Sequence, residues 1–427
     1  MNSRGWKMKD QHDIRQGRGA GSTSARPRLM TRSLTLLFIV AFGTTLSFYL
    51  LLSVVPLYAA SVGAGGIGAG LATGALMLST VAAEFVTPRL VTRFGYRVVL
   101  IAGILLLGAP SLGLIGSASM TAIFVVCLVR GLGFAITVVV GGSLAASLSP
   151  EERRGEGLGL YGVVCNIAGV LGLPLGVWLV AHAGYPTVFM GGALAAMAGL
   201  LVIPAMPARE PHAEPAVGMM TGLRNRALLR PSVVFFAIAM AGGIVVTFLP
   251  LAVGGATASL VPLALFAQAA SATAARWWAG RVGDRHGSSG LLMPSLVVSA
   301  VGILMLVAVS NPVVVLLGMV VFGAGFGVAQ NASMAIMFER VSRSGYDAVS
   351  AIWNLAYDGG FGVGATGYGI LAEQTGYPVA FASTALVMLV ALIPALRDRS
   401  VGRGSTTRET DSTAPDDVGM AACNVDP

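Results

Sequence analysis

Long apolar stretches follow one another along most of the chain, and short segments with charged residues, glycine or proline separate them. A helix needs about 20 mostly apolar residues to cross the ~30 Å hydrocarbon core of a bilayer. Strands of a membrane barrel would show shorter segments of about ten alternating residues instead. The pattern therefore predicts membrane-spanning helices, and we expect twelve of them, at about residues 34–57, 67–88, 98–116, 121–147, 157–181, 187–205, 231–252, 258–279, 290–309, 312–337, 348–372 and 379–396.

Composition supports the same class of protein. Hydrophobic residues make up 55% of the chain and charged residues only 11%, whereas a soluble domain carries about a quarter charged residues. The composition excludes a soluble domain and a disordered chain. A cleaved signal peptide is not expected at the first span, because a long polar leader precedes it and further spans follow. We predict an all-α membrane protein.

The positive charges have a one-sided distribution. Eight of the 27 Lys and Arg residues lie in residues 1–32. The others lie at the even-numbered junctions and the C-terminus, except Arg130 inside the fourth span, and the odd-numbered loops carry none. This positive-inside pattern predicts a multi-pass protein of the cell membrane with both termini in the cytoplasm. It also explains the net charge of +8 without nucleic acid, for which the sequence shows no binding motif.

The two halves of the sequence repeat each other at a constant offset of 192 residues. Pro88–Gly95 aligns with Gly280–Gly287, Gly131–Phe134 with Gly323–Phe326, and Gly184–Pro186 with Gly376–Pro378. Parallel repeats of this kind predict two six-helix bundles that rock about a site near the bilayer midplane. We expect these domains at 33–205 and 231–397, a cytoplasmic linker at 206–230, and disordered cytoplasmic tails at 1–32 and 398–427.

With these motifs the chain resembles the major facilitator superfamily of transporters over residues 33–397. The resemblance rests on the loop motif at 280–287 and its partner at 88–95, on Arg130 before Gly131, and on a glycine-proline run at 169–176 that is similar to the motif of drug-exporting antiporters. It implies a cytoplasmic gate motif formed by Gly280, Asp284, Arg285, Gly287, Arg89, Arg93 and Gly95. It also implies an antiporter-like motif of Gly169, Gly172, Pro174 and Gly176, although Leu173 stands where exporters often have glycine.

Few ionisable residues lie within the spans, where each is costly and usually functional. Arg130 and Asp358 each lie about ten residues into a helix, or ~15 Å deep at ~1.5 Å per residue. Glu84 lies nearer the cytoplasmic face. We predict that Asp358, Arg130 and Glu84 couple transport to protons, because protonating Asp358 would change its interaction with Arg130. A substrate pocket is expected at the polar residues Asn166, Gln268, Gln330, Asn331 and Asn354.

Other chemistry is not evident in the sequence. The three Cys and four His residues are scattered, and no phosphate-binding loop, hydrolytic triad or metal cluster is found. We therefore expect no cofactor, no metal and no enzyme activity, although a membrane enzyme stays the weakest alternative. The best interpretation is a monomeric secondary transporter that exports a small molecule against protons by alternating access. A proton-coupled symporter that imports a metabolite, a transport-inactive membrane receptor and a channel-like protein remain alternatives.

Overall fold

The computed structural model describes residues 29–150, 153–206, 226–341 and 345–392. These residues form helices joined by short turns, and no strand occurs among them. The predicted tails at 1–32 and 398–427 lie outside the described residues except for 29–32. Of the linker predicted at 206–230, residues 207–225 lie outside them and 226–230 belong to the helix Arg226–Ala252. The all-helical class is confirmed for the described part of the chain.

The described part of the N-terminal half contains four long helices and several shorter elements. They are α1 (Arg32–Leu52), α2 (Val54–Ala59), the π-helical turn η1 (Ala60–Ala64), α3 (Gly65–Gly108), η2 (Ala109–Leu114), α4 (Met120–Leu148), α5 (Arg154–Met197), η4 (Ala198–Leu201) and η5 (Ile203–Ala205). Helix α1 begins where the Thr31 hydroxyl accepts a hydrogen bond from the Leu34 amide, which satisfies one of the free amides of the first turn.

The C-terminal half repeats this arrangement. Its elements are α7 (Arg226–Ala252), η6 (Gly255–Leu260), α8 (Val261–His286), η7 (Ser288–Gly290), α9 (Leu292–Met305), α10 (Pro312–Glu339), α11 (Tyr346–Thr375) and α12 (Tyr377–Val390). Helix α10 is capped by Asn311, whose side-chain oxygen accepts from two backbone amides, and Pro312 occupies the first position, where no amide is needed.

Glycines in the left-handed region end helical segments at equivalent places in the two halves. Gly95 and Gly287 have φ near 80°, and so do Gly184 and Gly376. Each pair is 192 residues apart, which is the offset of the sequence repeat. Because only glycine adopts this backbone without strain, the repeat has kept the residue at both turns. Gly95 divides α3, and Gly184 divides α5, into two helical parts.

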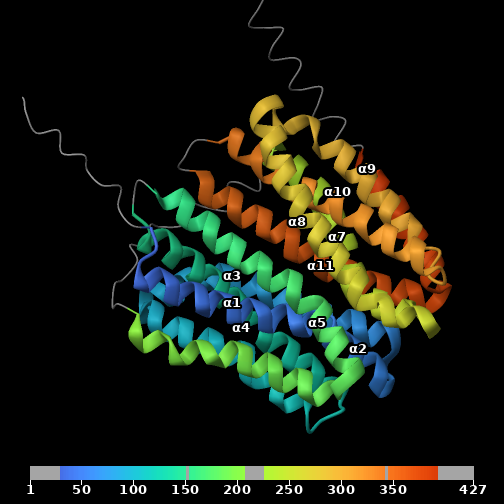
Figure 1. Cartoon of the computed structure of the whole chain (residues 1–427), viewed down its shortest axis with the longest axis horizontal. Coiled ribbons are helices and arrows are strands. Elements are labelled where there is room, and N and C mark those ends of the chain that lie inside the picture. The colour runs from blue at the N-terminus through green and yellow to red at the C-terminus, as the bar shows by residue number, and fades with distance from the viewer. Residues whose placement is uncertain (1–28, 151–152, 207–225, 342–344, 393–427) are drawn as a thin grey trace, which may run out of the picture.

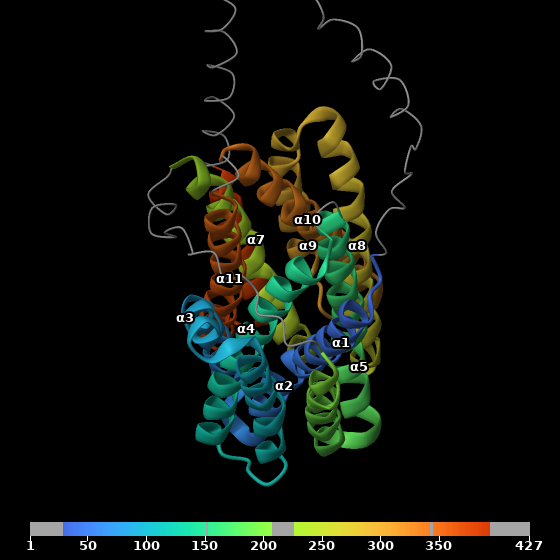
Figure 2. The ribbon, with the colours of Figure 1, turned by 90° about the vertical axis from the view of Figure 1, so that its left-hand side faces the viewer.

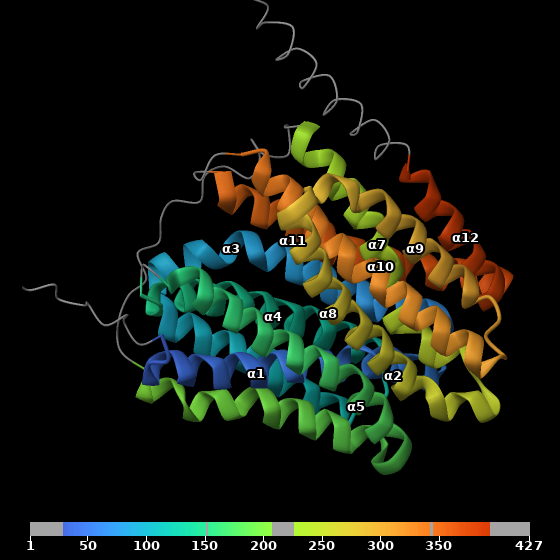
Figure 3. The ribbon, with the colours of Figure 1, turned by 45° about the horizontal axis from the view of Figure 1, so that its top comes forward.

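The two halves form two groups of helices that pack side by side. The blue-to-green helices α1 to α5 lie on one side and the yellow-to-red helices α7 to α12 on the other (Figures 1 to 3). Helix α3 packs along α11 and α5 along α8, and α7 also contacts α2 and α3. The domain bounds 33–205 and 231–397 stay predictions. Seven helical stretches of the described residues are long and apolar enough to cross a membrane, and the number twelve stays a prediction.

The outer surface of the described helices is strongly apolar. Leu194 and Leu201 are 71% and 85% exposed, and many other large aliphatic and aromatic side chains are similarly open. A soluble monomer exposes only limited contiguous apolar patches. Exposed Ser and Thr side chains instead donate to carbonyls of their own helix, as Ser143 does to Val139, which satisfies their hydrogen-bonding groups without water. This surface is that of a multi-pass integral membrane protein.

Helices α3 and α11 meet along a line of glycines, which we call the α3–α11 seam and define by Gly66, Gly70, Gly74, Gly362 and Gly369. A Cβ at Gly70 would lie 2.5 Å from the Ala365 carbonyl oxygen, and one at Gly369 would lie 2.6 Å from the Gly66 oxygen. Small residues let helix backbones approach this closely in lipid. The seam therefore brings the backbones of the two halves into direct contact.

Two polar contacts extend the interface at the end where α3 begins. The hydroxyls of Thr73 and Thr247 lie 2.9 Å apart and are buried between α3 and α7. The Glu373 carboxylate, at the end of α11, accepts a hydrogen bond of 3.2 Å from the Ile67 amide in the first turn of α3. A carboxylate is favoured at a helix N-terminus by the helix dipole. These contacts hold the two halves together at this end of the bundle.

Replacing Gly360 with alanine is expected to lower the free energy of unfolding by about 1–3 kcal/mol, the usual cost of overpacking. Its Cβ would lie 2.7 Å from the Phe236 carbonyl oxygen on α7, and a backbone atom cannot move aside as a side chain can. Gly367→Ala on the same helix is the matched control, because nothing lies within 4 Å of its Cβ. Thermal unfolding in detergent should show a lower midpoint for Gly360→Ala alone, and equal midpoints would contradict this packing.

Candidate functional site

A cavity lies between the two halves, with walls from α1, α5, α7, α8, α10 and α11. It leaves about 630 Å³ free of protein atoms, including the space at its mouth. Its polar lining consists of Tyr49, Asn166, Gln268, Thr273, Arg276, Gln330 and Tyr357. Because both halves contribute to the wall, any movement of one half against the other changes the cavity.

One wall of the cavity is aromatic. Tyr357 and Phe361 follow each other at a spacing of four on α11, so they lie on one face of the helix, and Trp353 continues the same row. The rings of Tyr357 and Phe361 stack with centroids 4.8 Å apart, and those of Trp353 and Tyr357 stack at 5.7 Å. Phe326 on α10 also lines the cavity. The cavity thus offers flat apolar surface beside its polar groups.

The structure brings three of the five predicted pocket residues together. Asn166, Gln268 and Gln330 all line the cavity, from α5, α8 and α10. Asn331 lies instead beside Gly280, with its amide nitrogen 3.5 Å from where a Cβ of that glycine would be. Asn354 is half-buried and is not part of the cavity wall. Sequence position alone could not separate these, because the orientation of each side chain around its helix decides which one faces the cavity.

Two acidic side chains meet across the interface. The carboxyl groups of Glu84 on α3 and Asp358 on α11 are hydrogen-bonding neighbours. Glu84 is half-buried and Asp358 is buried. Two carboxylates in contact repel each other, so such a pair is stable only when it holds at least one proton. The two carboxyl groups therefore form a direct contact between the two halves.

Two tyrosines connect this acid pair with the cavity. The hydroxyls of Tyr49 on α1 and Tyr357 on α11 are hydrogen-bonding neighbours, again across the two halves. Both tyrosines interact electrostatically with Asp358 on one side and with Arg276 on the other. Because both tyrosines also line the cavity, they connect the acid pair directly with the cavity wall.

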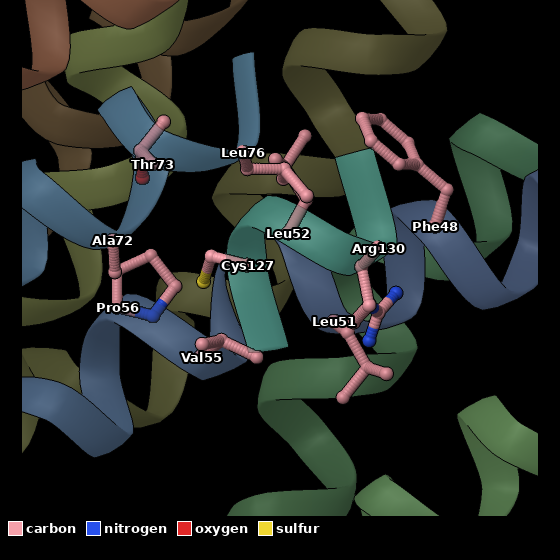
Figure 4. Close-up of a pocket in the computed structure, with 10 residues that line it drawn as sticks. All are labelled: Phe48, Leu51, Leu52, Val55, Pro56, Ala72, Thr73, Leu76, Cys127 and Arg130. Carbon is pink, nitrogen blue, oxygen red and sulfur yellow. The ribbon is translucent and has the colours of Figure 1, made fainter. Parts of the chain in front are cut away.

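Arg130 occupies a different environment from Asp358. It is 2% exposed and lines a small apolar pocket with residues of α1, α3 and α4 (Figure 4). One guanidinium nitrogen donates to the Ser47 carbonyl oxygen at 3.2 Å, and the other terminal nitrogen has no partner among the described residues. The structure brings Asp358 together with Glu84 and does not bring it together with Arg130.

The predicted gate motif lies at the ends of two helices. Asp284, Arg285 and Gly287 are exposed around the end of α8, and Arg89 and Arg93 are exposed on α3 before Gly95. No hydrogen bond or ion pair of the Asp284 carboxylate is found among the described residues. Gly280 and Gly283 allow close approach, since a Cβ on Gly283 would lie 2.7 Å from the Ser288 hydroxyl. The second copy of the motif forms the last turns of α8 and the turn at Gly287, and its acid has no partner among the described residues.

The antiporter-like motif packs α5 against α1. A Cβ at Gly169 would lie 3.0 Å from the Tyr49 ring, and one at Gly172 would lie 2.8 Å from the Tyr49 Cβ. Gly176 continues the same contact towards Leu50, and Pro174 lies inside the helix. The glycines therefore fix the position of Tyr49, a residue of the cavity lining.

Sequence reasoning missed three parts of this site. Tyr49 has the sequence context of a packing residue in an apolar span, and Tyr357 directly precedes Asp358, to which the functional role was assigned. Arg276 lies close enough to a helix end for its side chain to reach the membrane surface. For Arg276 the repeat did give a signal, and it was set against the closeness of this residue to the membrane surface. Arg276 and Glu84 occupy equivalent positions of the repeat, each four residues before its loop motif.

A family profile and a known relative indicate the same protein family for this chain. The family profile described as Major Facilitator Superfamily matches residues 37–270 and 232–416. A protein of Methanocaldococcus jannaschii, described as an uncharacterized MFS-type transporter, is 25% identical over 171 residues. That match spans 40% of this chain and 40% of the length of the relative.

Solved structures resemble the whole described fold. A variant of the nucleoside transporter NupG superposes with a TM-score of 0.72 at 14% identity, covering 86% of this chain and 99% of NupG. The xylose transporter XylE from E. coli, in a partially occluded inward-open conformation, gives 0.69 at 12% identity, with 86% and 97% coverage. A bacterial homologue of the human lysosomal transporter Spinster, in an inward-facing occupied conformation, gives 0.70 at 14% identity, with 86% and 96% coverage. At these identities the likeness shows a shared fold.

Proposed function

Because the chain belongs to the major facilitator superfamily, and is therefore a transporter and not an enzyme, we propose that it is a secondary active transporter that exports a small organic molecule in exchange for protons. The observation that carries this proposal is the Glu84–Asp358 pair between the two halves. The cavity is the substrate site, and Asn166, Gln268 and Gln330 contact the substrate there.

Proton coupling follows from the chemistry of the acid pair. While α3 and α11 are in contact, the pair retains a proton, because two bare carboxylates at that distance repel each other. Loss of the proton favours an arrangement in which α3 and α11 are further apart at this point. A ligand that binds one arrangement better shifts the equilibrium towards it, and here the proton is that ligand. Arg130 has a supporting role, because it fixes α4 to the Ser47 carbonyl of α1.

The arrangement of the halves supports an inward-facing state. By the distribution of positive charge, the beginning of α3 and the end of α11 face the outside, and this is where the Thr73–Thr247 and Glu373–Ile67 contacts join the halves. Asp284, which has no partner among the described residues, lies at the end that this charge distribution assigns to the cytoplasm. Two of the similar solved structures are described as inward-open or inward-facing. Alternating access then requires the outer contacts to break while the cytoplasmic end closes.

Export is favoured over import by the glycine-proline run of α5. Gly169, Gly172, Pro174 and Gly176 form the motif that resembles exporting antiporters, and they set the distance between α5 and Tyr49. We place the protein in the cell membrane as a monomer with cytoplasmic termini. The test is transport by purified protein in liposomes, with compounds selected by thermal stabilisation, with and without an imposed pH gradient. Uphill movement only with the gradient supports the proposal, and identical movement without it contradicts proton coupling.

Asp284→Asn is expected to reduce transport several-fold without unfolding the protein. The acid lies in the last turn of α8, where the helix dipole disfavours a negative charge. We propose that it gains a favourable partner near the beginning of α5 when the cytoplasmic end closes. In the variant, a cysteine at the cavity position Thr273 should react faster with a thiol reagent from the cytoplasmic side. His286→Gln, an exposed neighbour, is the control, and equal transport and labelling in both variants would contradict a gating role.

A further inference from the structure

We propose that the cavity selects organic anions with a flat apolar body, and that Arg276 binds their carboxylate, sulfonate or phosphate group. The inference rests on the proposed function in one respect only, namely that this cavity is where the transported molecule binds. It adds a substrate class and a specificity residue to that site. The argument depends on the charge of the cavity lining, on the partners of Arg276, and on the shape of the opposite wall.

Arg276 provides the positive charge of the cavity. The other polar lining side chains are hydroxyls and amides, and no carboxylate belongs to the lining among the described residues. Arg276 is only half-buried, on the part of α8 that faces α5. A cation that has lost part of its hydration requires a compensating anion or hydrogen-bond acceptors. A substrate that brings an anionic group would supply both.

The surroundings of Arg276 leave its guanidinium available. No carboxylate lies within 4 Å of it and no hydrogen bond of it is found in the described part of the chain. The ionisable groups that interact with it electrostatically are the hydroxyls of Tyr357 and Tyr49. The acid pair does not neutralise it, because Asp358 has Glu84 as its hydrogen-bonding neighbour.

Two other arginines of this protein have partners for their guanidinium groups. Arg281, on the same helix, lies over the Trp277 ring at 3.3 Å from its centroid. Arg130 donates to the Ser47 carbonyl. Neither lines the central cavity. Arg276 thus differs from both in pointing its charge at a space that a ligand can enter.

The aromatic wall defines the rest of the ligand. Tyr357 and Phe361 present stacked rings on α11, and Phe326 adds a third ring from α10. A flat ring system can lie against these faces while its acidic group reaches Arg276, and the planar guanidinium pairs with a carboxylate or phosphate through two parallel hydrogen bonds. The side-chain amides of Gln268 and Gln330 can then form hydrogen bonds with polar substituents of the ligand. A cationic analogue of the same shape would meet the Arg276 charge instead.

Three probes of nearly identical shape test this assignment: 2-naphthoate, 2-naphthamide and 2-naphthylmethylamine as its cation. Binding to the full-length protein in nanodiscs is measured by calorimetry without any gradient. We expect the unsubstituted protein to bind the acid at least tenfold more tightly than the amide or the amine. Arg276→Gln should weaken binding of the acid by about 10–100-fold, the range of a charge-assisted hydrogen bond, and leave the amide unchanged. Arg276→Lys should retain part of the preference, and Arg281→Gln should behave like the parent.

Each contrary result has a defined meaning. Equal binding of the three probes, preference for the amine, or absence of binding by all three at millimolar concentration would overturn the anion assignment. So would an Arg276→Gln variant that binds the acid like the parent. Unchanged amide binding in Arg276→Gln shows that the cavity is still folded. Because no gradient is used, discrimination by charge together with absent proton-driven transport would reject the proposed function and leave this inference standing.

Discussion

Asp358→Asn is expected to abolish accumulation of substrate driven by a proton gradient, while downhill exchange continues. Asparagine keeps the size of the side chain and can still bond to Glu84, but it cannot release a proton at this position. The variant then lacks the repulsion between the two carboxylates at positions 84 and 358, which we assign to one step of the cycle. Transport assays in liposomes with and without a pH gradient measure both activities on the same preparation.

Two companion variants make this result specific. Glu84→Gln removes the other acid of the pair and should cause the same loss, since either residue alone cannot form a carboxyl–carboxylate pair. Glu339→Gln changes an exposed acid at the end of α10 and should leave uphill transport intact. If Asp358→Asn accumulates substrate like the parent, the acid pair is not the coupling site.

Gly70→Val should reduce transport at least tenfold by holding the outer end of the bundle open. The Cβ of residue 70 would lie 2.5 Å from the Ala365 carbonyl oxygen of the other half, so α3 and α11 cannot close to their present distance. The helices of each half keep their own packing, and we expect the protein to fold. A cysteine at Thr247, which is fully buried here, should become reactive towards an impermeant thiol reagent from outside.

The control for Gly70→Val is Gly367→Val on α11, because a Cβ at position 367 has no atom within 4 Å. It introduces the same β-branched residue into a helix and carries the same propensity cost. Transport should be close to that of the parent. Full transport by Gly70→Val would show that the seam does not have to close during the cycle.

The sequence predicted the fold well because its strongest signals are independent of tertiary contacts. Hydrophobic length predicted helices, and the described residues are helical. The 192-residue repeat predicted two related halves, and glycines of positive φ lie at its equivalent positions Gly95, Gly184, Gly287 and Gly376. The resemblance to the superfamily is confirmed by the family profile. Helix boundaries were less accurate, since α2 is separated from α1 at Ser53 within a single predicted span.

The site was predicted only in part, because it depends on which helix faces touch. Depth in the membrane drew attention to Asp358 and Arg130, whereas the structure has Glu84 as the hydrogen-bonding neighbour of Asp358. Depth gives position along a helix axis and contains no information about rotation around it. The same limit applies to Asn331 and Asn354, which lie outside the cavity wall, and to Tyr49, which lines it.

The central claim is that the two halves open alternately at their two ends, and paired spin-label distances test it most directly. One pair joins the outer positions Ser61 and Gln374, and the other joins the inner positions Thr92 and His286; all four are exposed. We predict that a change from acidic to alkaline buffer shifts the two distance distributions in opposite directions, and that Asp358→Asn removes the shift. Distances that stay constant, or that change together at both ends, would contradict alternating access.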